Sequence, residues 1–272
     1  MLWFLKINFF IMVINISKDA VGLGREAAKE ASVAIQNAIE ENGYANIILA
    51  TGTSQFETLN QLVLGKGIDW SKVVMFHLDE YIELPITHEA SFRKYLKERF
   101  LNKVPALKAV YLINGELNSA SECERLGELI KQHPIDVALV GIGENAHLAF
   151  NDPPADFETQ QPYHVVQLDE LCRKQQLAEG WFTSLDEVPA KAISMSIQQI
   201  MKSKNIICSV PETRKAFAIK NCLENAPDSM YPASILQIHP QCKFYFDQSS
   251  AALLSEGTVE KAINNEFSLA DK

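Results

Sequence analysis

Residues 47–54 read IILATGTS, and this stretch decides the fold because it joins an apolar run directly to a polar turn that contains Gly52. An unbroken apolar run is typical of a strand that is buried on both faces of a parallel sheet. Apolar residues at helical spacing precede it between residues 23 and 41, and they follow it from Phe56 to Val63. A buried strand between two helices predicts one β–α unit of a parallel sheet.

The alternation of strands and helices continues along the chain. Further strands are predicted at residues 73–76, 110–113, 135–140, 163–168, 206–210 and 244–246. Further helices are predicted around residues 92–100, at 119–132, where Ser121 and Glu124 form a capping box, and at 193–201, 214–224 and 258–264. The pattern predicts an α/β fold of three layers, in which helices cover both faces of a mostly parallel sheet. Because no linker or repeat interrupts it, residues 13–272 are predicted to form a single domain.

Residues 1–12 read MLWFLKINFFIM and are predicted to be an N-terminal extension of that domain. The stretch is shorter than the roughly 20 apolar residues that span a bilayer, and it lacks the pattern of a secretory signal. An additional edge strand packed on the domain is the alternative interpretation.

The composition narrows the class of protein. The 272 residues are 47% hydrophobic, and 25 basic against 34 acidic side chains give a formal net charge of −9. This balance argues against a nucleic-acid partner, whose backbone requires a basic face, and no segment suits a membrane. Five scattered cysteines without a Cys-x-x-Cys pair favour reduced thiols in the cytoplasm. No histidine spacing indicates a metal centre.

Three predicted strands end in loops that carry polar side chains, at residues 51–54, 77–81 and 141–152. In parallel sheets ligands bind beyond the carboxyl ends of the strands, so we expect these loops to meet at one site. In the first loop, backbone amides and the hydroxyls of Thr53 and Ser54 can face an anion. A plain helix cap is the alternative interpretation of this loop.

The second loop places Asp79 and Glu80 side by side. Adjacent side chains of an extended chain point in different directions, so one carboxylate can enter the site while the other faces a structural partner. Asp79 is a candidate general base. A helix cap or a surface pair remains the alternative.

The third loop begins GIGENAHLAFNDPP at residues 141–154 and matches the G-x-G-x-x-G/A dinucleotide fingerprint. That fingerprint requires a full helix directly afterwards, which Pro153 and Pro154 would terminate, so a nicotinamide cofactor is disfavoured. Asn145 and Asp152 instead flank His147, and such neighbours can orient an imidazole for acid/base catalysis. A structural histidine is the alternative.

Four segments together resemble the glucosamine-6-phosphate deaminase/isomerase family, which shares its fold with the 6-phosphogluconolactonases. The segments are LDEYIELP at 78–85, HEASF at 88–92, the histidine loop at 141–153 and, more weakly, PASILQIHP at 232–240. The lactonase branch usually has Asp-Glu-Arg and Gly-His-Thr where this chain has Asp-Glu-Tyr and Ala-His-Leu. The resemblance therefore favours the deaminase side and covers nearly the whole chain after Met12.

The resemblance implies roles for individual residues. Asp79 would move a proton between C2 and C1 of the opened sugar, and His147, supported by Asn145 and Asp152, would open the pyranose ring. The loop of Thr51, Gly52, Thr53 and Ser54 would hold the phosphate of a small-molecule sugar phosphate, with Lys215 as its cationic partner. Neither a metal nor an organic cofactor is implied. The products would be fructose 6-phosphate and ammonia.

Three departures from the family pattern make this chain a divergent member. Ala146 replaces the usual glycine before the histidine, and Asp152 replaces the usual glutamate. The family's phosphate-binding arginine precedes Val188, where Arg173 is a poor positional match. A lactone hydrolase, or a non-enzymatic sensor of sugar phosphates, remains the alternative function. The short segment before Ser17 leaves no room for the DNA-binding motif of such a sensor, and assembly into a homo-oligomer is left open.

Overall fold

The computed structural model describes residues 12–260, which contain two β-sheets. The larger sheet is parallel throughout, with the strand order β1-β10-β9-β6-β2-β3-β5. Its strands are β1 (Val13–Ser17), β2 (Ala45–Leu49), β3 (Val73–His77), β5 (Ala109–Tyr111), β6 (Val137–Val140), β9 (Asn205–Val210) and β10 (Cys242–Asp247). Six of these were predicted from the sequence, and the prediction is confirmed to within two residues at each end.

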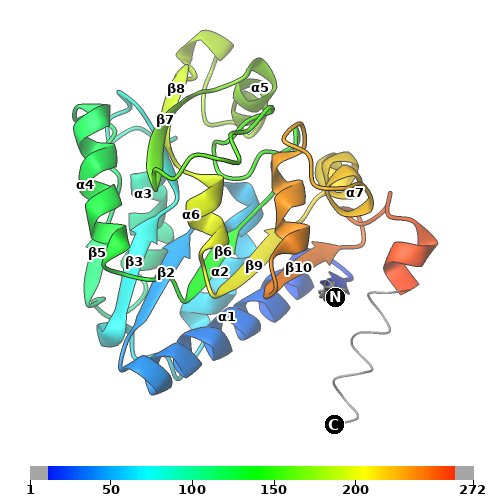
Figure 1. Cartoon of the computed structure of the whole chain (residues 1–272), viewed down its shortest axis with the longest axis horizontal. Coiled ribbons are helices and arrows are strands. Elements are labelled where there is room, and N and C mark those ends of the chain that lie inside the picture. The colour runs from blue at the N-terminus through cyan, green and yellow to red at the C-terminus, as the bar shows by residue number, and fades with distance from the viewer. Residues whose placement is uncertain (1–11, 261–272) are drawn as a thin grey trace, which may run out of the picture.

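Helices cover both faces of this sheet, as the apolar pattern predicts (Figure 1). Every residue of β2, β3 and β6 is buried, so alternate side chains of each strand enter two separate cores. Ile47 and Leu49 pack in the core that holds α1 (Ala20–Asn42) and α2 (Phe56–Leu64). Ile48 packs in the opposite core, with α4 (Ser119–Lys131), α6 (Ile197–Met201) and α7 (Ala216–Glu224). The three-layer α/β fold is confirmed.

A second, antiparallel sheet was not predicted. It consists of β4 (Asp79–Tyr81), β8 (Lys191–Met195) and β7 (Tyr163–Gln167) in that order. The predicted helix at 193–201 is therefore wrong for its first residues, because Ile193 and Met195 belong to β8. Their apolar side chains suit a buried strand as well as a helix, and α6 begins only after Ser196, whose hydroxyl accepts from the amide of Gln199 at 3.2 Å.

Capping side chains set the helix ends. Asp19 begins α1 by accepting from the amide of Gly22 at 2.8 Å, and Gly43 ends it with a φ of 79°. The predicted capping box of α4 is wrong: Asn118 is the cap and accepts from the amide of Ser121 at 3.1 Å. Asn118 directly precedes the first residue of the helix, whereas Ser121 already lies in its first turn.

The remaining helices are short. They are α3 (Phe92–Leu96), which continues as a π-helix (Lys97–Leu101), α5 (Glu170–Ala178), and 3-10 helices at Thr53–Gln55, Trp70–Lys72, Leu185–Glu187, Thr213–Lys215 and Pro232–Ile238. The last predicted helix is present at 256–260, while its residues 261–264 and residues 1–11 of the predicted extension lie outside the described residues. Between residues 12 and 260, no helix is long and apolar enough to cross a membrane.

The small sheet and α5 lie at the end of the molecule toward which β2 and β3 point (Figure 1). Residues 141–152 contain no helix, in agreement with the rejection of the dinucleotide fingerprint. The carboxyl ends of the parallel strands are thus covered by the small sheet and α5, and the polar loops lie beneath that cover.

Candidate active site

A cavity that opens to solvent lies at the carboxyl ends of the central strands, and the space within it, including the part open to solvent, is about 490 Å³. The three loops predicted to meet do line it, together with the turn after β9 and one face of α5. Of the predicted site residues, those that line it are Thr51, Gly52, Thr53, Ser54, Asp79, His147 and Lys215. Asn145 and Asp152 lie behind His147 and contact its ring.

The Thr51–Ser54 loop is held from two sides. Gly52 has a φ of 86°, a conformation that costs glycine little, and Tyr95 donates its hydroxyl to the Gly52 carbonyl at 3.0 Å. The buried side chain of Gln55 donates to the carbonyls of Val140 and Ser209 at 3.2 and 3.3 Å. This glutamine therefore fixes the loop against the ends of β6 and β9, a role that the sequence did not reveal.

Asp79 presents a buried carboxyl group to the cavity, with 6% of the residue exposed. Burial, reinforced by the neighbouring charge of Glu80, raises the pKa of Asp79 to about 8. A carboxyl group whose pKa is this close to neutrality can both accept and return a proton.

Glu80 points away from the cavity, as expected for the second of two adjacent carboxylates. It accepts from the Ser91 hydroxyl at 3.0 Å and from the backbone amides of Phe92 and Arg93 at 3.2 and 2.8 Å. The Arg93 guanidinium lies 3.3 Å from the same carboxylate. Glu80 thus caps the first turn of α3 and fixes the backbone that carries Asp79.

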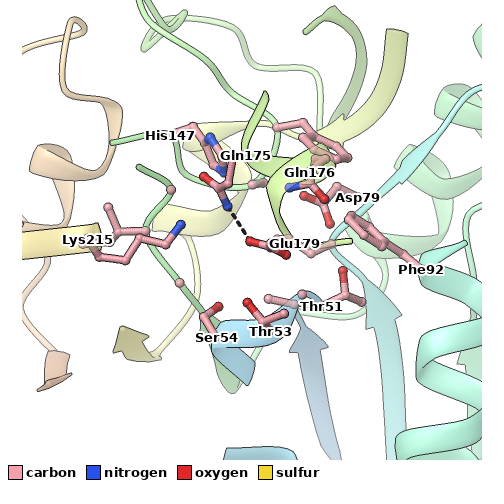
Figure 2. A pocket seen from close by; sticks show the side chains of 18 residues that line it. Thr51, Thr53, Ser54, Asp79, Phe92, His147, Gln175, Gln176, Glu179 and Lys215 are labelled. Atoms are coloured by element: carbon pink, nitrogen blue, oxygen red, sulfur yellow. Dashed lines mark hydrogen bonds between the residues drawn. The ribbon is translucent and has the colours of Figure 1, made fainter. Parts of the chain in front are cut away.

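His147 is held by a buried network on one side of its ring. Its Nδ1 lies 2.7 Å from Oδ1 of Asn145 and 3.4 Å from Oδ1 of Asp152. Gly143 permits this position, because a Cβ there would lie 2.2 Å from the imidazole. The ring faces the cavity with its other edge (Figure 2). In the part of the chain that the structure describes, Nε2 has no hydrogen-bond partner.

The network also determines which ring nitrogen carries the proton. The amide nitrogen of Asn145 donates to Asp152 and to Asp169, at 2.9 Å each. Since ionised carboxylates only accept, the oxygen of Asn145 must face His147, whose Nδ1 is then the donor. Burial alone would raise the pKa of Asp152, but hydrogen bonds from His147 and Asn145 outweigh it and lower that pKa. Nε2 is therefore left as a basic nitrogen that faces the cavity.

Two cations lie beside the Thr51–Ser54 loop. Lys215 is 2% exposed and lines the cavity, and burial lowers its pKa to about 8. Within residues 12–260 its ammonium has no hydrogen bond or ion pair, so it is available to an anionic ligand. Arg214, which sequence reasoning missed, donates to the hydroxyl of Thr53 at 3.0 Å. Its position next to Lys215 was the available signal.

Helix α5 and the residue that follows it supply three further lining residues, Gln175, Gln176 and Glu179, which were also missed. Gln176 has a buried side-chain oxygen without a hydrogen-bond partner, which a ligand could satisfy. Arg173, in contrast, turns away and donates to the carbonyls of Leu185 and Val188 at 2.5 and 3.0 Å. It does not line the cavity, so it is not a substitute for the arginine that the resemblance requires.

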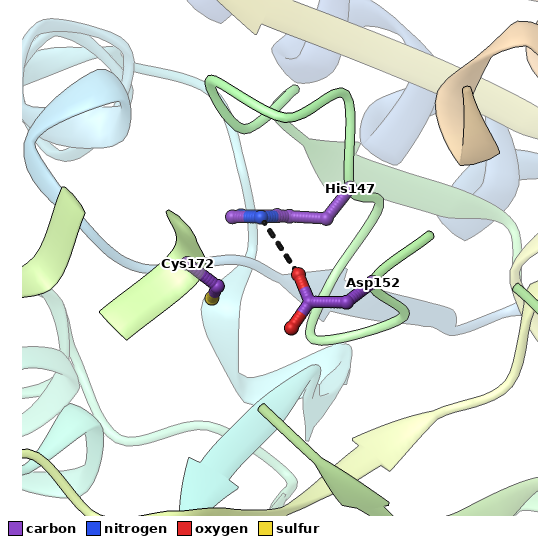
Figure 3. A group of neighbouring side chains, drawn as sticks. All are labelled: His147, Asp152 and Cys172. Carbon is purple, nitrogen blue, oxygen red and sulfur yellow. Dashed lines mark ion pairs between the residues drawn. The ribbon is translucent and has the colours of Figure 1, made fainter. Parts of the chain in front are cut away.

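One group of side chains has donor atoms suited to a metal ion. The ligand atoms of His147, Asp152 and Cys172 lie within 4.8 Å of one another (Figure 3). Histidine, carboxylate and thiolate form the donor set that zinc prefers. Burial, followed by the charges of Asp152 and Asp169, raises the pKa of the Cys172 thiol well above its usual range. The thiol is therefore protonated, and the side chains of His147 and Asp152 already form hydrogen bonds with Asn145.

Comparisons with known proteins show the family to which the chain belongs. The chain matches the family model of glucosamine-6-phosphate isomerases and 6-phosphogluconolactonases over residues 18–244. It is 33% identical over 228 residues to the glucosamine-6-phosphate deaminase of Bacillus cytotoxicus, a match that covers 84% of this chain and 85% of the relative. A solved monomeric glucosamine-6-phosphate deaminase has a TM-score of 0.80 at 29% identity, covering 89% of this chain and 100% of that one. The chain belongs to this family of enzymes.

The lactonase branch shares the fold. The 6-phosphogluconolactonase of Trypanosoma brucei has a TM-score of 0.73 at 18% identity, and the match covers 90% of this chain and 100% of that one. At this identity the likeness concerns the fold alone. The sequence resemblance to the deaminase/isomerase family is confirmed.

Proposed function

We propose that this protein is a glucosamine-6-phosphate deaminase, which converts an amino-sugar phosphate and water into fructose 6-phosphate and ammonia. One observation carries the proposal: the Asp79 carboxyl group, the free Nε2 of His147 and the unpaired ammonium of Lys215 line the same cavity. The names of the relatives support the same substrate. We also propose that the enzyme is cytoplasmic, which its five free cysteines support.

The first step opens the sugar ring. Because Nδ1 of His147 carries its proton, Nε2 is free to accept the proton of the C1 hydroxyl and to return it to the ring oxygen. Asn145 and Asp152 stabilise the imidazolium that forms between these two transfers. The product is the open-chain aldehyde with its amino group on C2.

The second step moves a proton between carbons. With the C2 amino group in its ammonium form, the Asp79 carboxylate removes the proton from C2 and one N–H proton passes to O1, which gives an enolamine; Asp79 then delivers its proton to C1. The C2 iminium that results is attacked by water, and the carbinolamine releases ammonia. Lys215, the Thr51–Ser54 amides and the Thr53 hydroxyl would hold the phosphate, so that C1 and C2 lie near Asp79. Since all these groups come from one chain, the reaction does not require a homo-oligomer.

The direct test is to incubate the protein separately with glucosamine 6-phosphate and with 6-phosphogluconolactone. We expect ammonia and fructose 6-phosphate from the first substrate and no faster hydrolysis of the second than in buffer. Lactone hydrolysis without ammonia release would instead establish the lactonase alternative.

The role of His147 can be tested separately. His147→Gln should slow the cyclic substrate more than an open-chain analogue, because only the former requires ring opening. His164→Gln is the matched control, since His164 bonds to Asn151 at 2.8 Å and does not line the cavity. Equal slowing of both substrates by His147→Gln would exclude ring opening as its role.

A further inference from the structure

The cavity contains a carboxylate at the end where the proposed function places the phosphate. Glu179, which follows the last turn of α5, extends into the space between the Thr51–Ser54 loop and His147, with Lys215 to one side (Figure 2). Only 4% of its side chain is exposed. An anion thus already lies among the groups that would bind the anion of a substrate.

This carboxylate is held in place by donors on every side. Its Oε1 accepts from the Gln175 amide at 2.9 Å and from the Arg214 guanidinium at 3.2 Å. Its Oε2 accepts from the Trp181 indole at 3.2 Å. Arg214 in turn donates to Thr53 of the loop, so Glu179 shares its cation with the predicted phosphate loop.

Carboxylates already neutralise the cations beside the Thr51–Ser54 loop, which disfavours the binding of a further anion. Arg214 pairs with Glu179 and also with Glu144 and Glu212, at 2.8 and 2.5 Å. Three carboxylates therefore surround the two cations, and the charge of Glu179 partly offsets that of Lys215. A phosphate dianion brought next to a buried carboxylate would be strongly repelled, so both cannot occupy this end of the cavity together.

We propose that Glu179 is an internal anion, which occupies the phosphate subsite of the ligand-free protein and is displaced by the phosphate of the substrate. Glu179 thereby sets the affinity of the site for phosphate. The proposal rests on the proposed function in one respect only, namely that this subsite binds a phosphate group. It requires neither the deaminase reaction nor any particular sugar.

The test compares two variants that each remove one negative charge next to Arg214. Glu179→Gln removes it inside the cavity, whereas Glu212→Gln removes it outside, where the glutamate is 43% exposed. Titration calorimetry with inorganic phosphate gives the affinity without any turnover, and thermal unfolding shows whether each variant is folded. We expect Glu179→Gln to bind phosphate about tenfold more tightly, and Glu212→Gln to change the affinity less than about threefold, since only the first charge is buried next to the ligand.

An independent readout uses the wild-type protein. Displacement of Glu179 breaks its bond with the Trp181 indole, so saturating phosphate should shift one indole N–H resonance, identified by its absence in Trp181→Phe. If phosphate leaves that resonance unchanged, or if both glutamate variants tighten binding equally, the proposal is overturned. Weaker binding by Glu179→Gln would also overturn it. Because these readouts need no catalysis, an inactive protein would refute the proposed function without deciding this question.

Discussion

Asp79 and Glu80 are consecutive residues of β4, yet their carboxylates lie on opposite sides of the strand. Asp79 lines the cavity without a hydrogen bond to its carboxylate in the described chain, and Glu80 accepts from the backbone of α3 and from Arg93. Because adjacent side chains of an extended strand point to opposite sides, one carboxylate faces the cavity and the next one stabilises the fold. Neutralising Asp79 should therefore lower the activity, whereas neutralising Glu80 should mainly lower the stability.

Asp79→Asn should lower kcat by roughly 10²- to 10⁴-fold, the usual contribution of a general base, while KM changes little. Glu80→Gln is the matched control. It should lower the melting temperature, because removing one partner of a buried pair costs about 3–5 kcal/mol, with a smaller effect on kcat of the folded fraction. Steady-state ammonia release and thermal unfolding of both variants provide the comparison. An Asp79→Asn enzyme with wild-type kcat would remove this residue from the mechanism.

Asp79→Asn should also change how stability depends on pH. The pKa of Asp79 is raised from 3.8 to about 8 on folding, so the native protein holds a proton that the unfolded chain releases. The stabilising contribution of this proton is complete below pH 3.8 and is lost as the pH rises to about 8, by at most about 1.4 kcal/mol per pH unit. Asparagine does not titrate. Denaturant unfolding should therefore show a variant whose advantage over the wild type grows between pH 4 and 8 and then becomes constant; a constant difference throughout would contradict the raised pKa.

The pH dependence of kcat/KM should be a narrow bell with its maximum near pH 8. Activity rises as Asp79 loses its proton, and it falls as Lys215, whose pKa is lowered to about 8 by burial, loses the charge that binds phosphate. Lys215→Arg keeps the cation at all accessible pH values. In that variant the alkaline limb of the profile should move to higher pH, while the acid limb should stay at the same pH. Loss of activity above pH 8 to the same extent in both proteins would show that Lys215 does not cause the alkaline limb.

The sequence revealed the parallel sheet and its loops because both depend on local patterns. The apolar run at 47–50 can be buried only between two helical layers, and the chemistry of Asp79 and His147 follows strand ends directly. The second sheet was not predictable in this way, because β4 pairs with β8 across more than a hundred residues of chain and contains only Asp79–Tyr81.

The site residues that were not predicted from the sequence were missed for a different reason. Gln175 lies on a short polar helix and Glu179 directly follows it; the position of this helix over the cavity depends on tertiary packing, which no local spacing encodes. Arg214 donates to Thr53, from which 161 positions of the chain separate it, so no local pattern indicates this contact. Site residues that follow a strand could be predicted from the sequence, whereas those on the helix that covers the cavity could not.

Asn145→Asp should destabilise the protein more at neutral than at acidic pH. The Asn145 amide donates to two carboxylates, those of Asp152 and Asp169, and an aspartate would replace these bonds with like-charge repulsion. We expect a loss of about 2–3 kcal/mol near pH 7, the cost of leaving charged acceptors unsatisfied. The loss should shrink below about pH 5, where one of the three carboxyls takes up a proton.

The control for this change is Asn145→Ser, which also removes the amide donor but adds no charge. Its deficit in the free energy of unfolding should vary little between pH 5 and 7. If the aspartate and serine variants show the same pH dependence by denaturant titration, the two carboxylates are not both ionised, and the inferred proton on Nδ1 of His147 loses its basis.

Ala146→Gly should cost much less stability than another buried alanine-to-glycine change. Ala146 has a φ of 68°, a left-handed conformation that costs an alanine about 1–2 kcal/mol. Glycine relieves this strain, which offsets the loss of a buried methyl group and the greater freedom of the unfolded chain. Ala27, fully buried in α1, is the matched site without that strain, and Ala27→Gly should cost about 2 kcal/mol. Denaturant unfolding should therefore separate the two variants by at least about 1 kcal/mol, and equal losses would mean that the backbone at Ala146 is not strained.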